Sequence, residues 1–252
     1  MSIPLPLSSV HTLEAATLAS WPALETQTDG AWVSRFSRGH TKRANSLTIL
    51  DAADDGEVDR RLDAVVADYR RRGLPPTHRL SPLTPPAVAA RLTTRGGAPF
   101  ERSLAFGRLL QPGSPVDSGA QLLRPTDPAW IGAQTRFHRF DAPTIVTLTE
   151  MLARISVPAA ALLLEDERGE PSAAAMVLLI GPLAMILKVV VAPDARGRGF
   201  GKDVMGAALG WAAGQGATEV FLHALASNAP AVSLYRSLGF VERYSFSHVV
   251  FG

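Results

Sequence analysis

A strand-like run that passes through a proline into a glycine-rich turn restricts the fold of this chain more than any other feature. The segment reads VVVAPDARGRGFGK over residues 189–202. Glycines that open a helix after a buried strand form an anion cradle in outline, because the first helical turn leaves amide N–H groups unpaired and glycine lets a phosphate approach the backbone. Arg196, Arg198 and Lys202 add positive charge at the same end. Three glycines alone would fit a plain strand-to-helix loop at least as well.

Two other kinds of phosphate-binding loop match this segment poorly. A Walker loop has glycine five positions before its Gly-Lys pair and Ser or Thr after it, whereas Arg196 and Asp203 occupy those positions around Gly201-Lys202. A dinucleotide fingerprint has the spacing G-x-G-x-x-G after the first strand of a unit, whereas this chain has G-x-G-x-G late in its length. The segment is therefore neither of these loops.

The uncharged run just before this segment predicts two buried strands and not a membrane span. Residues 172–187 carry no charge, and Gly181-Pro182 divides them into two pieces of strand length. A spanning helix would need about 20 apolar residues without such a turn. We therefore expect two strands joined by a tight connection, and no membrane association.

The composition is typical of a folded protein without a strongly charged surface. The 252 residues are 46% hydrophobic and 19% charged with a net charge of +2, so we expect a sizeable core and no nucleic-acid partner. There is no cysteine, which excludes disulfides, a thiolate zinc site and a cysteine nucleophile, and we predict no metal site. The first Lys or Arg is Arg35, so the N-terminus lacks the basic region of a secretory signal. A cytoplasmic location is expected.

A break at Gln111-Pro112-Gly113-Ser114-Pro115 predicts two domains, at residues 1–112 and 120–252. The helices and strands expected in the first domain are a helix at 12–20, strands at 31–36 and 46–50, and a helix at 57–72. Those of the second are helices at 128–139, 143–155, 202–213 and 229–238, strands at 159–164, 173–180, 185–191 and 219–225, and a last strand pair up to Phe251. This alternation predicts an α/β fold with a mixed α+β sheet.

Three separated elements of the second half together resemble the Gcn5-related N-acetyltransferase (GNAT) superfamily. They are Arg196-x-x-Gly199-x-Gly201 after a valine-rich strand, Asn228 after the next strand, and Leu234-Tyr235-x-x-x-Gly239-Phe240. The resemblance covers about Trp130 to Gly252 and implies a GNAT fold there. The fragment at residues 41–46, with Trp21-Pro22 upstream, looks like the front half of a two-module GNAT subgroup. The N-terminal half would then be a smaller, degenerate GNAT-like module without a coenzyme A site of its own.

The resemblance also implies where the site lies. In the family, the R/Q-x-x-G-x-G/A motif binds the pyrophosphate of acetyl-coenzyme A through backbone amides, and the preceding strand splays from its neighbour to receive the pantetheine arm. Tyr235 would protonate the departing thiolate. The residues implied to bind acetyl-coenzyme A are Val189, Val190, Val191, Arg196, Gly197, Arg198, Gly199, Phe200, Gly201, Lys202 and Asn228.

The chemistry of these side chains is consistent with the implied roles. Asn228 and Tyr235 are seven residues apart, a spacing that returns to within about 20° of the same helix face. A tyrosine with a pKa near ~10 is protonated at neutral pH and can supply a proton to a thiolate whose conjugate acid has a pKa of roughly 8 to 9. Tyr235 could equally be a core aromatic residue, and Asn228 could be a helix N-cap ahead of Pro230.

The residue that would deprotonate an amine acceptor is not evident. The candidates in the second half are Glu150, Glu165, Asp166, His138 and His223. An alkyl ammonium group has a pKa near ~10 and must lose a proton before attack, and a chain of water molecules would serve as well as a side chain.

We therefore predict an acetyl-coenzyme A-dependent N-acetyltransferase that transfers acetyl directly to a primary amine of a small molecule or protein. It would act as a monomer or homodimer. The alternative is a non-catalytic acyl-coenzyme A sensor or interaction module, which the missing base and the extra N-terminal half favour. A nucleotide-binding protein is a weaker alternative.

Overall fold

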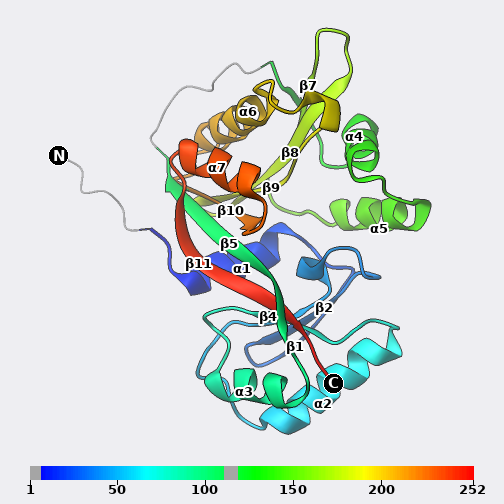
Figure 1. Cartoon of the computed structure of the whole chain (residues 1–252), viewed down its shortest axis with the longest axis vertical. Helices are drawn as coiled ribbons and strands as arrows, with labels where there is room; N and C mark the ends of the chain where they lie inside the picture. Colours follow the sequence, from blue (N-terminus) through cyan, green and yellow to red (C-terminus); the bar gives the residue numbers. More distant parts are fainter. Residues whose placement is uncertain (1–6, 111–118) are drawn as a thin grey trace, which may run out of the picture. The chain divides into compact units, whose positions relative to one another are not determined.

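The computed structural model describes residues 7–110 and 119–252 (Figure 1). In these residues the strands form one mixed sheet with the order β1-β2-β3-β4-β11-β5-β10-β9-β8-β7-β6, which confirms the predicted fold class. The chain forms two compact units. The N-terminal unit consists of Ser9–Ala105, Ala224–Asn228 and Glu242–Gly252, and the C-terminal unit mainly of Phe106–His223 and Ala229–Val241. The predicted break at residues 111–115 lies outside the described residues.

The N-terminal unit contains three helices among its described residues, and its longer strands are partly shared with the other unit. Its elements are α1 (Val10–Ser20), β1 (Glu25–Asp29), β2 (Trp32–Phe36), the 3-10 turn η1 (Lys42–Ala44), β3 (Leu47–Ile49), α2 (Val58–Arg71), β4 (Thr77–Leu80), α3 (Pro86–Thr94) and most of β5 (Pro99–Leu109) and β11 (Val241–Val250). Strand β4 pairs in parallel with β3 and antiparallel with β11.

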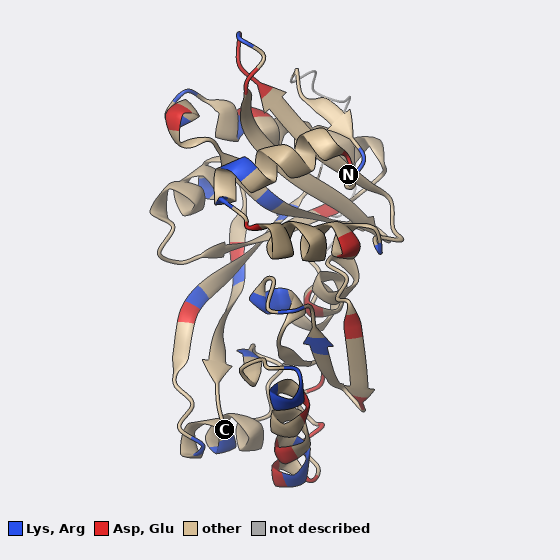
Figure 2. Cartoon of the chain, turned by 90° about the vertical axis from the view of Figure 1, so that its right-hand side faces the viewer, with Lys and Arg blue, Asp and Glu red and all other residues tan. Residues whose placement is uncertain are grey.

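The predicted amphipathic helix is α2. Leu62, Val65 and Tyr69 of its apolar stripe are buried in a core with residues of β2, β3, α3 and β11. Basic and acidic residues are spread along the remainder of the helix (Figure 2). The three- and four-residue spacing of the apolar positions therefore identified both the helix and its buried face.

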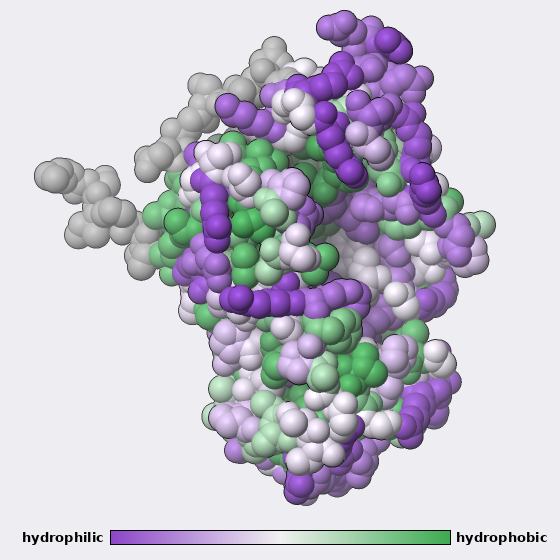
Figure 3. All heavy atoms as spheres, in the orientation of Figure 1, coloured by the Kyte–Doolittle hydropathy of each residue, from purple (hydrophilic) through white to green (hydrophobic). Residues whose placement is uncertain are grey.

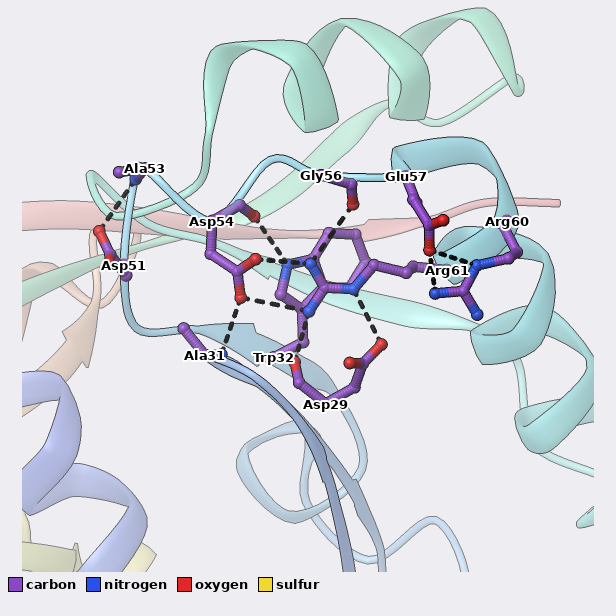
Figure 4. A network of polar contacts seen from close by, with 10 residues as sticks. All are labelled: Asp29, Ala31, Trp32, Asp51, Ala53, Asp54, Gly56, Glu57, Arg60 and Arg61. Atoms are coloured by element: carbon purple, nitrogen blue, oxygen red, sulfur yellow. Dashed lines mark hydrogen bonds and ion pairs between the residues drawn. The ribbon is translucent and has the colours of Figure 1, made fainter.

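Arg61 is the exception on the buried side of α2, and it fastens the helix to the β1–β2 turn (Figure 4). Its Nε donates to Asp29 at 2.9 Å and its Nη1 donates to Asp54 at 2.7 Å, while the guanidinium lies 4.2 Å from the centroid of the Trp32 ring. Gly30 occupies this turn with a φ of +58°, and a Cβ there would lie 2.7 Å from Asp54 Oδ2. Glycine is therefore favoured at position 30.

Two buried histidines lie on adjacent strands, His78 on β4 and His248 on β11. Burial, followed by the charge of Arg79, lowers the pKa of each to about 3. In the folded protein both imidazoles therefore stay neutral at pH values well below about 6.5, the ordinary histidine pKa.

We expect the stability of the protein to fall as the pH drops from about 6.5 toward 5. In this range the unfolded chain binds protons at His78 and His248 and the folded chain does not, so each histidine should remove up to about 1.4 kcal/mol of unfolding free energy per pH unit. Urea denaturation between pH 7.5 and 5 measures this slope, and His248→Gln should remove about half of the histidine contribution. Unfolding free energies that stay constant over this range would contradict the assignment.

The C-terminal unit holds the remaining elements. They are β6 (Gln121–Leu123), α4 (Pro128–His138), α5 (Ala142–Leu152), β7 (Ala159–Glu165), β8 (Pro171–Ile180), β9 (Leu183–Val191), the 3-10 turn η2 (Pro193–Ala195), α6 (Phe200–Gly214), β10 (Glu219–Leu225) and α7 (Ala229–Ser237). Strands β8 and β9 are antiparallel, with Ile180 opposite Leu183 across Gly181-Pro182, so the predicted tight connection is confirmed. No helix of the described ranges has the length and apolarity needed to cross a membrane.

The last strand pair that the sequence suggested is wrong, because residues 241–250 form the single strand β11. No glycine or proline interrupts these ten residues, and from Tyr244 to Val249 buried positions mostly alternate with half-buried ones as in a strand with one covered face. Strand β1 escaped prediction because its sequence, ETQTD, is polar and almost wholly exposed.

Candidate active site

Strands β9 and β10 separate partway along their length. Their parallel pairing runs from Leu183 opposite Glu219 to Ile186 opposite Leu222, although β9 continues to Val191 and β10 to Leu225. Residues 183–187 of β9 are buried and residues 188–191 only half-buried. This is the separation that the resemblance implied for the strand before the glycine turn.

A bulge between β8 and β9 lies at the point of separation. The register shifts between Ala174 and Met176 of β8, which pair with Val190 and Leu187 of β9. Lys188, inside the bulge, has a φ of +57°, a left-handed conformation that is unusual for a residue with a side chain. Because a bulge bends its strand and increases the local twist, it accounts for the departure of β9 from β10.

Two side chains of α4 hold this bulge. Trp130 Nε1 donates to the Ala175 carbonyl at 2.9 Å, and Gln134 Nε2 donates to the Lys188 carbonyl at 2.9 Å. Trp130 and Gln134 are fully buried and one helical turn apart, so one face of α4 supplies both. Sequence reasoning predicted the helix but missed this function, which the i, i+4 spacing of two hydrogen-bonding side chains on an otherwise apolar face could have indicated.

The glycine turn after β9 contains consecutive backbone N–H groups that have no hydrogen-bond acceptor among the described residues. Within the described part of the chain, the N–H groups of Arg196 to Gly201 make no hydrogen bond. The Lys202 amide, in contrast, donates to the Gly199 carbonyl at 2.8 Å. A role for Lys202 in anion binding would therefore fall to its exposed side chain.

Two glycines of this turn are favoured for different reasons. Gly199 precedes α6 with a φ of +94°, which strains any residue with a Cβ. A Cβ on Gly201 would lie 3.3 Å from Leu234 of α7 and 3.5 Å from Val191 of β9. The start of α6 therefore packs closely against both elements.

Tyr235 is packed as a core aromatic residue on α7. It is 5% exposed, and its ring centroid lies 6.1 Å from that of Phe106 and 6.1 Å from that of Phe240. Burial raises the pKa of Tyr235 to about 12, so the phenol stays protonated at neutral pH. No residue in the described ranges forms a hydrogen bond with its hydroxyl. Tyr235 is thus a core residue whose hydroxyl proton is still available for transfer.

Asn228 lies immediately before α7 and is exposed. Its backbone N–H donates to the Leu225 carbonyl at 3.0 Å, in the turn that leads from β10 into the helix. Tyr235 and Val232 form the buried face of α7. A common groove for Asn228 and Tyr235 stays a prediction.

Two of the candidate bases lie at the connection between β7 and β8, the hydrophilic tip at the top of Figure 3: Glu165 is the last residue of β7, and Asp166 begins the turn. Asp166 Oδ1 accepts the amides of Arg168 at 2.9 Å and Glu170 at 3.1 Å. These backbone hydrogen bonds lower the pKa of Asp166, and they identify it as a turn-forming residue. Glu165 is exposed beside it.

The remaining candidate bases differ in their distance along the chain from the strand separation. His223 follows Leu222, the last residue of β10 paired with β9, and is half-buried. His138, at the end of α4, stacks on Phe140 with ring centroids 5.1 Å apart, and burial and then Lys188 lower its pKa. Glu150 lies on α5. His223 is therefore the candidate adjacent to the point where the strands part.

The sequence matches two families of known proteins. Residues 129–240 match the Acetyltransferase (GNAT) family, and residues 7–149 match the family described as Probable histone acetyltransferase Rv0428c C-terminal. A protein of Bacillus subtilis (strain 168), Uncharacterized N-acetyltransferase YobR, is 26% identical over 239 residues, which cover 93% of this chain and 95% of the relative.

Solved structures share the fold over nearly the whole chain. The GCN5-related N-acetyltransferase from Kribbella flavida superposes with a TM-score of 0.70 at 17% identity, covering 98% of this chain and 96% of that one. A tandem GNAT protein from the clavulanic acid biosynthesis pathway gives a TM-score of 0.64 at 14% identity, covering 98% and 88%. The chain therefore belongs to the GNAT acetyltransferases, joins a GNAT domain to an N-terminal module of the Rv0428c type, and is an acyltransferase.

Proposed function

We propose that this acyltransferase uses acetyl-coenzyme A and transfers the acetyl group directly to a primary amine of a small molecule or protein. The observation that carries the proposal is that the backbone N–H groups from Arg196 to Gly201 make no hydrogen bond among the described residues. They follow the part of β9 that no longer pairs with β10. Membership of an enzyme family favours this function over a non-catalytic sensor.

The turn has the properties needed to hold the diphosphate of acetyl-coenzyme A. Unoccupied amides at a helix N-terminus bind anions, and the partial positive charge of the helix end adds to the attraction. The exposed side chains of Arg196, Arg198 and Lys202 supply further positive charge. Asn228 at the start of α7 would add a polar contact.

The outer part of β9 has the properties needed to hold the pantetheine arm. Val190 and Val191 pair with Ala174 and Ala173 of β8 on one side, and no residue of β10 pairs with them on the other. Their backbone groups on that side are available to the amides of pantetheine, and their half-buried side chains offer an apolar wall.

The chemistry then needs few groups from the protein. Acetyl-coenzyme A supplies an activated thioester, and an unprotonated amine is the nucleophile. Tyr235 would provide the proton that the sulfur leaving group takes up, and His223, at the strand separation, is our candidate to accept the proton of the amine. The absence of cysteine favours direct transfer, because a thiol acyl-enzyme cannot form.

Release of free coenzyme A thiol over a panel of acceptors tests this function. The panel would contain histone tail peptides, peptides with free N-termini, amino acids and simple amines. Acceptor-dependent release together with a mass increase of one acetyl group on the acceptor is expected. Binding of acetyl-coenzyme A without release for any acceptor would favour the sensor, and stabilisation by ATP or NAD instead would favour a nucleotide-binding protein.

Gly199→Val should abolish the thermal stabilisation that acetyl-coenzyme A gives the wild-type protein. A valine at a φ of +94° strains the turn, and the repositioned amides no longer converge on one anion. At a ligand concentration of 100 times the dissociation constant, the wild type should gain about 2.7 kcal/mol, which differential scanning fluorimetry detects. Gly206→Ala is the matched control on α6, where a Cβ meets no atom within 4 Å. Equal shifts in Gly199→Val and wild type would refute the amide cradle.

A further inference from the structure

The sheet of the N-terminal unit has two different faces. Leu47 of β3 and Val249 of β11 lie on the face that packs into the apolar core with α2 and α3. Successive residues of a strand point to opposite faces, so Ser46 and Thr48, on either side of Leu47, lie on the other face. Arg79 of β4 is directly opposite His248 of β11, and all four side chains are buried.

This second face carries more positive than negative charge. Arg79 is 2% exposed and donates two hydrogen bonds of 2.7 Å to Glu14 of α1, which also accepts from the Tyr244 hydroxyl. Arg35, also 2% exposed, donates to the carbonyls of Arg43 and Trp21. Glu14 is fully buried, and its carboxylate acts electrostatically on Arg43, as does the Tyr244 hydroxyl. The charge of Glu14 thus acts on Arg79 and Arg43, while Arg35 has only main-chain acceptors among the described residues.

Arg43 is the one of these three arginines whose guanidinium contacts no acceptor in the described residues. Over residues 7–110 and 119–252, its guanidinium has no hydrogen bond or ion pair, and its Nε is buried. Burial, then Arg79 and Arg35, lower the pKa of Arg43 to about 9, so it is still a cation at neutral pH. Arg43 as a whole is half-buried, and an anion beside its guanidinium would offset the repulsion from Arg79 and Arg35.

Neutral hydrogen-bonding groups on the same face are also unsatisfied. Ser46 Oγ, Thr48 Oγ1 and both ring nitrogens of His248 are buried and make no hydrogen bond within the described residues. These side chains are 0%, 1% and 6% exposed, respectively. Buried polar atoms in native proteins almost always have a partner, so several of them on one sheet face indicate a ligand that completes them.

We propose that this face binds a carboxylate group, with Arg43 as its ionic partner and Ser46, Thr48 and His248 as hydrogen-bond donors. A carboxylate fits because one guanidinium is free: Arg79 is neutralised by Glu14, and Arg35 is engaged with main-chain oxygens. The planar fork of an arginine matches the two oxygens of a carboxylate. A hydroxyl or a neutral imidazole can donate one further hydrogen bond each. The site does not depend on the proposed acetyl transfer.

Ligand binding without acetyl-coenzyme A tests the site. The probes are acetate, N-acetylglycine, succinate and glycine at constant ionic strength, with chloride and inorganic phosphate for comparison. We expect at least one carboxylate to raise the melting temperature of the wild type in a concentration-dependent way. No shift with any of them, or a larger Arg43-dependent shift with inorganic phosphate, would overturn the proposal.

Variants separate a site from a general salt effect. Arg43→Met should weaken the binding of that carboxylate at least about 10-fold, and its ligand-free form should melt no lower than the wild type because an unpaired charge has been removed. Thr48→Val keeps the side-chain volume and should weaken binding by a few-fold. Arg60→Met, at an exposed ion pair on α2, is the matched control and should bind as the wild type does. Equal binding by Arg43→Met and wild type would refute the site.

A second arm identifies where the carboxylate comes from. If it belongs to the acceptor, Arg43→Met should raise the KM for an amino acid such as lysine but not for cadaverine, its counterpart without the carboxylate. If it belongs to a separate effector, carboxylates that lack an amine should bind equally well and leave both KM values unchanged in the variant. Either pattern requires the Arg43-dependent binding described above.

Discussion

Tyr235→Phe should lower kcat by about 10²- to 10⁴-fold, the usual contribution of a general acid, and leave the affinity for acetyl-coenzyme A unchanged. The hydroxyl forms no hydrogen bond within the described chain, so its removal leaves no buried group unsatisfied. The ring contacts with Phe106 and Phe240 are retained. Steady-state kinetics with a chemistry-limited acceptor, together with calorimetric binding of acetyl-coenzyme A, would measure the two effects separately.

The matched control for this variant is Tyr69→Phe. Tyr69 is also buried, but its hydroxyl donates to the Arg35 carbonyl at 3.0 Å in the N-terminal unit. Its loss should cost about 1 kcal/mol of stability and leave kcat unchanged. If Tyr235→Phe turned over as fast as the wild type, Tyr235 would have only the packing role that its aromatic neighbours already give it.

Glu14→Gln should destabilise the protein by about 3–5 kcal/mol, because it leaves Arg79 as a buried and uncompensated cation. Burial raises the pKa of Glu14, but the charge of Arg79 and the hydrogen bonds from Arg79 and Tyr244 outweigh it and hold the pKa below its usual value. Glu14 is therefore ionised at neutral pH, and the stability it provides is lost only as the pH falls through its lowered pKa. Urea denaturation at pH 7 measures the difference.

A second variant shows whether the lost stability comes from the charge. Glu14→Gln combined with Arg79→Met removes both charges and should recover part of the stability. Glu170→Gln is the control, since it breaks an exposed ion pair with Arg136 and should cost at most about 1 kcal/mol. A loss of similar size in Glu14→Gln and Glu170→Gln would show that the buried pair has no special weight.

The sequence predicted the glycine turn and its strand because their signals are local. The valine run, Pro193 and the glycines each restrict the backbone at their own positions, and Gly199 has the left-handed conformation that favours glycine. The separation of β9 from β10 is different in kind. It depends on the left-handed conformation of Lys188 and on Trp130 and Gln134, more than 50 residues earlier, and neither follows from the letters around β9.

The polar face of the N-terminal unit was unpredictable for the same reason. Glu14 and Arg79 are 65 residues apart in the sequence, and each alone looks like an ordinary exposed charge. Arg43 follows Lys42 in the fragment at residues 41–46, and two adjacent basic residues are typical of a turn in solvent. Only the pairing of β4 with β11 reveals that Arg79 and His248 are opposite each other on one buried face.

The position of β11 near the end of the chain also means that the N-terminal unit can finish folding only late in synthesis. Strand β4 receives its antiparallel partner only when residues 247–250 are available, long after the ribosome has finished the other strands of the N-terminal unit. Until then the nascent chain exposes an open strand edge at β4, a kind of surface that invites wrong pairing with other chains. Cutting the gene between the two halves would thus not yield two self-sufficient proteins.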